Sequence, residues 1–179
     1  MGLTILLQKA CRAGSRIPRD WPVRGFLRKT LNLHGPLHSE PPVAEADLRR
    51  AIEGSWSRET SDDPTEWSRA NPARGQCAVT ALIVQDFLGG DLLCATINLT
   101  PHYWNLLPNR RELDLTKEQF KEIVMAGNPR ISTRQRVLSF SETRRHYRRL
   151  RKLVHTALEK RIGQTATEPA HLGCSYLSD

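Results

Sequence analysis

The chain has 179 residues, a length that suits one domain with extensions at its ends. Hydrophobic residues make up 39% of it, enough for a core, while a mean hydropathy of -0.50 indicates that part of the chain is solvated. The formal charge of +8 favours acidic partners without specifying one. The apolar run at residues 3–7 is too short for a secretory leader or a membrane span, so we expect neither there.

Two segments have the composition of extensions to a central domain. Residues 1–42 have a strong excess of Lys and Arg and end in proline-rich sequence, which is typical of a poorly packed arm. Residues 163–179 carry no clear periodicity and are predicted to form a flexible tail. We therefore place the domain at residues 43–162.

The first half of this domain is predicted to alternate helix and loop. Residues 44–54 show the apolar spacing of a helix and end at a glycine. Residues 55–75 are rich in Ser, Asp and Pro, but Trp56 and Trp67 indicate a loop that packs against the domain. Residues 76–88 are broadly apolar and are followed by two glycines, which predicts a central helix.

Three short β-type runs come after the central helix, at residues 92–99, 102–107 and 111–115. Turn-forming residues at 100–101 and 108–110 separate them. Because neighbouring runs joined by short turns pair most simply with one another, we expect a small antiparallel sheet.

Two further helices are predicted after the strands. Thr116 and Gln119 have the spacing of a capping box, so a helix is expected to run from there to about residue 126 and to end at residues 127–129. A last helix is expected from Ser141, with basic residues on its outer faces. The fold class is therefore α+β: a central helix packed on a small antiparallel sheet, with flanking helices.

Three residues of the central region have the properties of a cysteine nucleophile with its base and orienting carboxylate. Cys77 begins the central helix, where free N–H groups and the helix dipole favour a thiolate. His102 opens the second strand and can reach the helix end as a general base. Asp114 lies on the next strand, where it can fix the histidine tautomer.

Other residues of the same region are candidates for the oxyanion site and the cleft. The backbone N–H of Cys77, with a side-chain donor such as Gln76 or the Trp104 indole, could hold a tetrahedral oxyanion. Trp104 is two residues from His102, so both share one face of a strand. Asn105 comes directly after Trp104 and belongs to the same candidate cleft.

These residues stand in three strings that resemble the transglutaminase-like branch of the papain-like superfamily, whose members read G-Q-C, H-x-W and D-P-T in that order. The strings here are Gly75-Gln76-Cys77, His102-Tyr103-Trp104 and Asp114-Leu115-Thr116. Leu115 stands where that family commonly has proline. The resemblance implies a papain-like core and acyl transfer through a cysteinyl thioester, by a peptidase, an amidase or a transglutaminase.

A closer resemblance, over about residues 45–158, is to the YunG-like family of bacterial proteins. It is carried by the strings GQCAVTALIVQDFLGG, HYWN and ELDLT, the last followed by Gln119 and Phe120. This resemblance implies a shared fold and no particular activity.

Plainer structural roles exist for the three residues of the candidate triad. Free cysteine is among the most buried residue types, so Cys77 could be a core residue. His102 could cap the turn after Pro101, and Asp114 could cap the helix expected near Thr116.

The alternative to an enzyme is a catalytically inactive binding domain. Arg144, Arg145, Arg148 and Arg149 on the last helix could then meet nucleic acid or an acidic partner, although a solvated helix face is the commoner meaning of such a run.

No cofactor or metal site is predicted, because the four cysteines lie far apart without a C-x-x-C string. A cytoplasmic protein is expected, with organellar targeting by the basic N-terminus as the alternative. The substrate, the choice between hydrolase and transferase, and the oligomeric state are not specified by the sequence.

Overall fold

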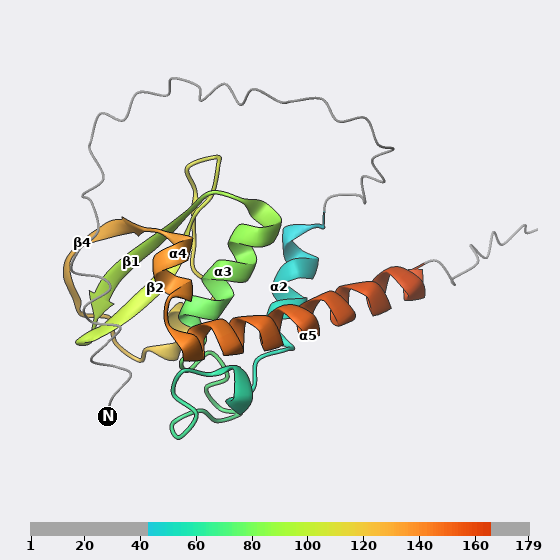
Figure 1. Ribbon diagram of the computed structural model, residues 1–179, viewed down its shortest axis with the longest axis horizontal. Coiled ribbons are helices and arrows are strands. Elements are labelled where there is room, and N and C mark those ends of the chain that lie inside the picture. Colours follow the sequence, from blue (N-terminus) through green and yellow to red (C-terminus); the bar gives the residue numbers. More distant parts are fainter. Residues whose placement is uncertain (1–42, 166–179) are drawn as a thin grey trace, which may run out of the picture.

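The computed structural model describes residues 43–165, and it shows an α+β domain in which helices cover one face of a four-stranded sheet (Figure 1). The sheet is antiparallel with the order β3-β2-β1-β4. Its strands are β1 Asp91–Ile97, β2 Thr100–Leu106, β3 Glu112–Leu113 and β4 Met125–Ser132. The helices are α2 Glu45–Glu53, α3 Cys77–Leu88, α4 Arg134–Leu138 and α5 Ser141–Thr165, with 3-10 turns η1 Arg58–Thr60 and η2 Lys117–Gln119. The predicted fold class is confirmed at this level.

Helix α3 is the centre of the core and is apolar over most of its surface. Its residues 78–84 are all buried, because the helix lies between the sheet and the layer formed by α2 and α5 (Figure 1). At its C-terminal end, Gly90 has φ +83°, and a Cβ atom there would lie 2.2 Å from the backbone oxygen of Leu106. A glycine is therefore required where α3 turns into the sheet.

Strands β1 and β2 form the hairpin that carries the candidate site. The turn lies at Asn98 and Leu99, which both have positive φ, and not at residues 100–101 as predicted. Pro101 is instead part of β2. Because β3 pairs only with the far end of β2, the edge of β2 beside Pro101 is open, and a missing N–H is tolerated there.

The prediction of a helix over residues 116–126 is wrong. Only η2 forms, and the chain then enters β4, which pairs with β1. The register shifts between Cys94 and Thr96, so that residues 127–129 bulge out of the ladder. The Gly-Asn-Pro signal, from which a helix end is predicted, marks this bulge instead. The short helix α4 is a further element that the sequence pattern does not predict.

The last helix starts at Ser141 as predicted and packs its apolar side on α2 and α3. A polar network holds it there: Arg134 forms an ion pair of 2.7 Å with Asp86, and the Tyr147 hydroxyl donates to the same carboxylate at 2.6 Å. Helix α5 runs to Thr165, so the predicted tail begins within its last turn. The predicted arm at 1–42 and the rest of the tail lie outside the described residues.

The loop of residues 55–75 packs as expected. The Trp56 indole donates to the Thr80 hydroxyl on α3 at 2.9 Å, and the Trp67 indole donates to the carbonyl of Pro72 at 3.0 Å. The first bond joins the loop to α3, and the second stabilises the loop internally, just before the segment that leads into Cys77. Over the described range, no helix is long and apolar enough to cross a membrane.

Candidate functional site

Cys77 lies at the N-terminal end of α3, half-buried, with its Sγ 4.0 Å from the backbone oxygen of Pro101. The N-cap residue Gln76 makes no side-chain capping bond, so its side chain leaves the first helical turn uncapped. The preceding Gly75 has φ +70°. The thiol therefore lies at the end of α3 where the first N–H groups are free of intrahelical partners.

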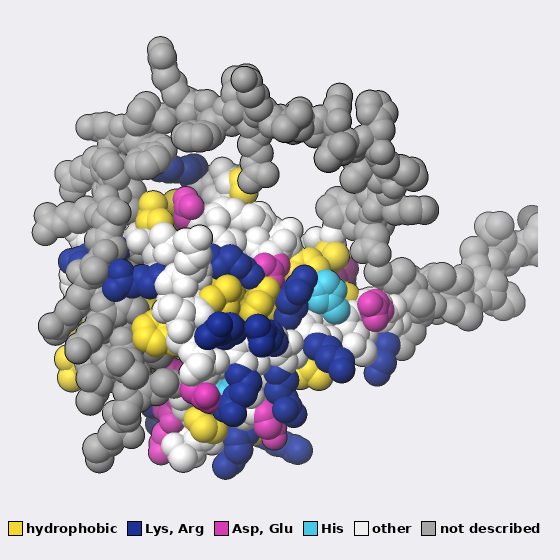
Figure 2. Space-filling model, in the orientation of Figure 1, with side chains coloured by type: hydrophobic (Ala, Val, Ile, Leu, Met, Phe, Trp, Pro, Cys, Tyr) yellow, Lys and Arg dark blue, Asp and Glu magenta, His cyan; other side chains and the backbone are white. Residues whose placement is uncertain are grey.

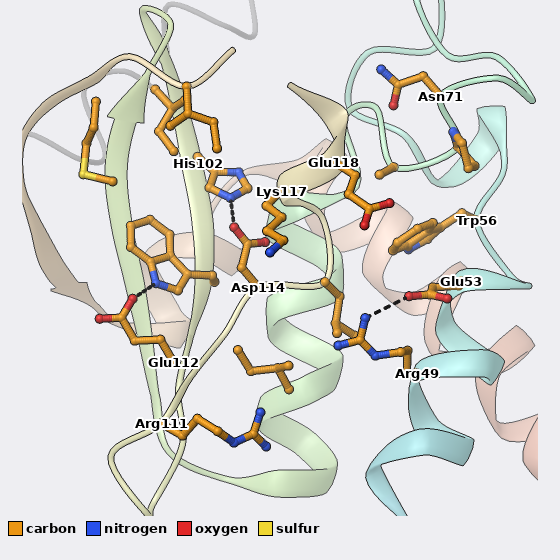
Figure 3. Close-up of a pocket in the computed structure, with 18 of the residues that line it drawn as sticks. Arg49, Glu53, Trp56, Asn71, His102, Arg111, Glu112, Asp114, Lys117 and Glu118 are labelled. Carbon is orange, nitrogen blue, oxygen red and sulfur yellow. Dashed lines mark hydrogen bonds and ion pairs between the residues drawn. The ribbon is translucent and has the colours of Figure 1, made fainter. Parts of the chain in front are cut away.

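His102 is fully buried and bonded to Asp114. Its Nε2 lies 2.7 Å from Oδ2 of Asp114, as Figure 3 shows by a dashed line. The other carboxylate oxygen, Oδ1, accepts the backbone N–H of Thr116 at 2.9 Å and its hydroxyl at 3.2 Å. Asp114 is therefore fixed by the start of the η2 turn, and it holds the Nε2 proton of the imidazole.

Two aromatic side chains fix the plane of the imidazole. The Trp104 ring stacks on His102 with centroids 5.5 Å apart, and Phe120 meets it edge-on at 5.0 Å. The Trp104 indole in turn donates to Glu112 at 2.8 Å. His102 and Trp104 share one face of β2, as the sequence predicts.

The electrostatic environment favours the protonated imidazole. Burial by itself lowers the pKa of His102, but hydrogen bonds with Asp114 and with Cys77 outweigh this effect and raise the pKa to about 9. The thiol lies close to this histidine in the chain path, because the Cys77 Sγ is 4.0 Å from the backbone oxygen of Pro101, the residue before His102. The three residues named from the sequence lie in one region, a cluster contributed by a helix, a strand and a loop. Asp114 follows β3, which ends at Leu113, and is not on a strand as predicted.

Gln119 is a member of this cluster that the sequence assigned only to a helix cap. Its Nε2 lies 3.3 Å from Nδ1 of His102, and its Oε1 accepts the N–H of Gly75 at 3.4 Å. The side chain thus connects the histidine to the turn before Cys77. The signal that could have identified it is its place after the ELDLT string.

The other predicted cleft residues lie elsewhere. Gln76 is fully buried and its Nε2 donates to the carbonyl of Ser57 at 2.9 Å. Asn105 is 1% exposed and donates to the carbonyl of Ala81 on α3 at 2.9 Å. In this structure the side-chain N–H donors of Gln76, Asn105 and Trp104 are already engaged, which leaves the backbone of the α3 N-terminus as the candidate oxyanion site.

The position of Asn105 gives a first testable prediction. Replacing Asn105 by alanine is expected to lower the free energy of unfolding by about 1–2 kcal/mol, since a buried hydrogen bond between β2 and α3 is lost. The rate at which iodoacetamide alkylates Cys77 should stay within about twofold of the wild type, a change of less than about 0.5 kcal/mol. Urea unfolding and mass spectrometry measure the two quantities. An alkylation of the folded variant that is about tenfold slower would assign Asn105 to the cleft after all.

Two cavities reach the cluster from different sides. One of about 750 Å³ has His102 and Asp114 on one side and Arg49 and Glu53 of α2 on the other (Figure 3), and Trp104 also lines it. The other, of about 80 Å³, contains Cys77. Its wall includes Asp62, Asp63, Arg74, Gly75, Tyr103, Gln119 and Phe120.

The basic residues named from the sequence lie on the exposed side of α5. Lys and Arg side chains gather along this helix in Figure 2, and Arg144, Arg145, Arg148 and Arg149 are all exposed. Arg145 is paired with Glu142 on the same helix. The described residues contain no cluster of three or more His, Cys, Asp or Glu side chains that could hold a metal ion.

Comparisons with known proteins place this domain in a family. A family model described as "YunG protein" matches residues 44–159. The curated "Uncharacterized protein YunG" of Bacillus subtilis (strain 168) is 35% identical over 74 residues, which are 41% of this chain and 61% of that protein. The aligned part is thus less than two thirds of the relative, and no solved structure gave a significant match. The match to the family model includes Cys77, His102 and Asp114 and spans well over half of the chain, which belongs to the YunG protein family.

Proposed function

We propose that this protein is a thiol acyl-transfer enzyme with a Cys77-His102-Asp114 triad and a core related to the transglutaminase-like and papain-like enzymes. The observation that carries the proposal is the fully buried imidazole of His102, bonded through Nε2 to Asp114 and raised in pKa by both Asp114 and Cys77. A histidine that only fills space in a core does not need both a carboxylate and a thiol beside its imidazole. The four-stranded sheet with α3 against one face is compatible with this core.

The geometry supports a two-step mechanism. His102 takes the Cys77 proton, and the thiolate attacks the carbonyl carbon of an amide or peptide, forming an S–C bond. The backbone N–H groups at the α3 N-terminus would stabilise the oxyanion. When the C–N bond breaks, the imidazolium gives its proton to the leaving amine. Water, or an amine, then attacks the thioester and releases the thiol.

The alkylation of Cys77 by iodoacetamide tests this proposal. Free thiols are about 99% protonated at pH 6.5. The wild type is nevertheless expected to react at that pH at least about tenfold faster than His102→Ala, because only the wild type has an imidazolium beside the sulfur. Quenched time points analysed by mass spectrometry, with the modified peptide identified, give the rate.

A matched comparison separates chemistry from unfolding. Asp114→Asn keeps the shape of the side chain and removes its charge, and it should fall between the wild type and His102→Ala. Circular dichroism checks that each variant is folded. If all three proteins react at the same rate at pH 6.5, the triad proposal is wrong, and the exposed basic residues of α5 become the better guide to function.

A further inference from the structure

The small cavity beside Cys77 contains polar groups that the acyl-transfer mechanism does not use. Tyr103 is 2% exposed and lines this cavity, and within the described part of the chain its hydroxyl has no hydrogen-bond partner. Asp62 lines the same cavity, and its Oδ1 is also buried without a partner among those residues. Because a buried polar group without a partner is destabilising by about 1–3 kcal/mol, two such groups around one cavity indicate a site for a ligand.

The charge around the cavity indicates what kind of ligand. Asp63 is neutralised by Arg74, whose Nη2 lies 2.7 Å from its Oδ2. Asp62 has no cationic side chain of residues 43–165 acting on its carboxylate. Burial, followed by the nearby charges of Asp63 and Glu142, raises the pKa of Asp62 to about 6, so its carboxylate is mostly ionised at neutral pH but poorly stabilised. The group that complements it best is a cation with N–H donors.

The size of the cavity limits this cation. About 80 Å³ is small beside the roughly 300–1,000 Å³ of pockets that hold drug-sized ligands, so a small group suits it best. A primary ammonium on a short carbon stem meets this limit. Its three N–H donors can serve both Asp62 and the hydroxyl oxygen of Tyr103.

We propose that the cavity beside Cys77 is a subsite for a primary ammonium group, bound by the Asp62 carboxylate and the Tyr103 hydroxyl. Binding of the ammonium does not depend on catalysis, and only the assignment of the amine to a substrate rests on the proposed function. The ammonium is then either the free amino group of an acyl donor or the amine that accepts the acyl group from Cys77.

Three alkylating probes of different charge test the subsite. Bromoethylamine carries a primary ammonium, (2-bromoethyl)trimethylammonium has the same charge without N–H donors, and iodoacetamide is neutral. At pH 7.5, the ratio of the bromoethylamine rate to the iodoacetamide rate at Cys77 should be at least about tenfold higher in the wild type than in Asp62→Asn, as for a lost charge-assisted hydrogen bond. Tyr103→Phe should lower the ratio by about two- to fivefold.

The controls isolate the subsite from general attraction. Asp63→Asn removes a neighbouring charge that is already paired, and should change the ratio by less than about twofold. The trimethylammonium reagent keeps the charge and lacks the N–H donors, so its dependence on Asp62 should be clearly smaller than that of bromoethylamine. An unchanged ratio in Asp62→Asn, or equal enhancement of both cationic reagents, would overturn the proposal. Each ratio compares two reagents on one thiol, so it can be measured even if Cys77 proves independent of His102.

Competition identifies the source of the amine. Protection of Cys77 from iodoacetamide by alaninamide, but not by ethylamine at equal concentration, would place the ammonium on the acyl donor. Protection by ethylamine alone would place it on the acceptor. Either protection should disappear in Asp62→Asn, and a protection that persists there would count against the subsite.

Discussion

Gly75→Ala is expected to lower the free energy of unfolding by about 3 kcal/mol or more, since it combines a strained backbone with a close clash. Gly75 has φ +70°, and an added Cβ would lie 2.4 Å from Oγ of Ser61 and 2.6 Å from the backbone nitrogen of Asp63. Part of this contact is backbone, which cannot rotate away. Urea denaturation of the wild type and the variant measures the difference.

Gly127→Ala is the matched control for this prediction. Gly127 has a similar φ of +78°, but nothing described lies within 4 Å of an added Cβ. Its substitution should therefore be destabilising by only about 1 kcal/mol, the effect of backbone strain without the clash. Equal effects of the two substitutions would mean that the turn before Cys77 is not held by Ser61 and Asp63 in the way described.

The second large effect concerns His102 and pH. The pKa of His102 is about 9 in the folded protein and about 6.5 in an unfolded chain. The folded state therefore binds the proton more tightly. The resulting stabilisation is fully present below about pH 6.5 and is lost as the pH rises through about 9. The expected loss in the free energy of unfolding between about pH 6 and pH 9.5 is on the order of 2–3 kcal/mol.

His102→Gln provides the comparison, since it fills much of the same space and does not titrate. The variant should lack the stabilisation that comes from protonating His102. The difference in unfolding free energy between wild type and variant should therefore shrink as the pH rises. Urea denaturation at several pH values measures it. A difference that is constant over the range would show that His102 is neutral in the folded protein, against the pair with Asp114 and Cys77.

Much of the fold can be predicted from local sequence patterns, and the exceptions have a physical cause. Helix α3 is predictable from its apolar residues and the glycines after it, and β1 and β2 are predictable from their apolar residues, although the turn between the two strands lies two residues before the predicted one. Strand β4 is not predicted from the sequence because it contains Gly127, Asn128 and Pro129, and these residue types are typical of turns. Only pairing with β1, with a bulge at these residues, makes the segment a strand.

The candidate site also contains residues that the sequence predicts and residues that it does not. Cys77, His102 and Asp114 could be named because the residue types and their order are carried by short strings. Gln119 could not be assigned its contact with His102, since that depends on η2 replacing the expected helix. Asp62 and Tyr103 could not be identified as neighbours from the sequence, because only the packed fold brings them to the wall of one cavity. Local patterns therefore identify candidate residues, and tertiary structure determines which groups surround them.

The arrangement of the strands also bears on how fast the site can assemble. β1 pairs with β2 and β2 with β3, each through a short connection, and the cysteine, histidine and aspartate cluster with its Gln119 contact is drawn from residues 75–119. Closing short loops costs little chain entropy, so contacts close in sequence form early in folding. Strand β4 must close a longer loop to reach β1. The pair of His102 and Asp114, which are 12 residues apart, can thus form early with the β2–β3 connection. The contact of Gly75 with Gln119 spans 44 residues, as large a separation as those that join β4 to β1, so the complete cluster forms no earlier than the complete sheet.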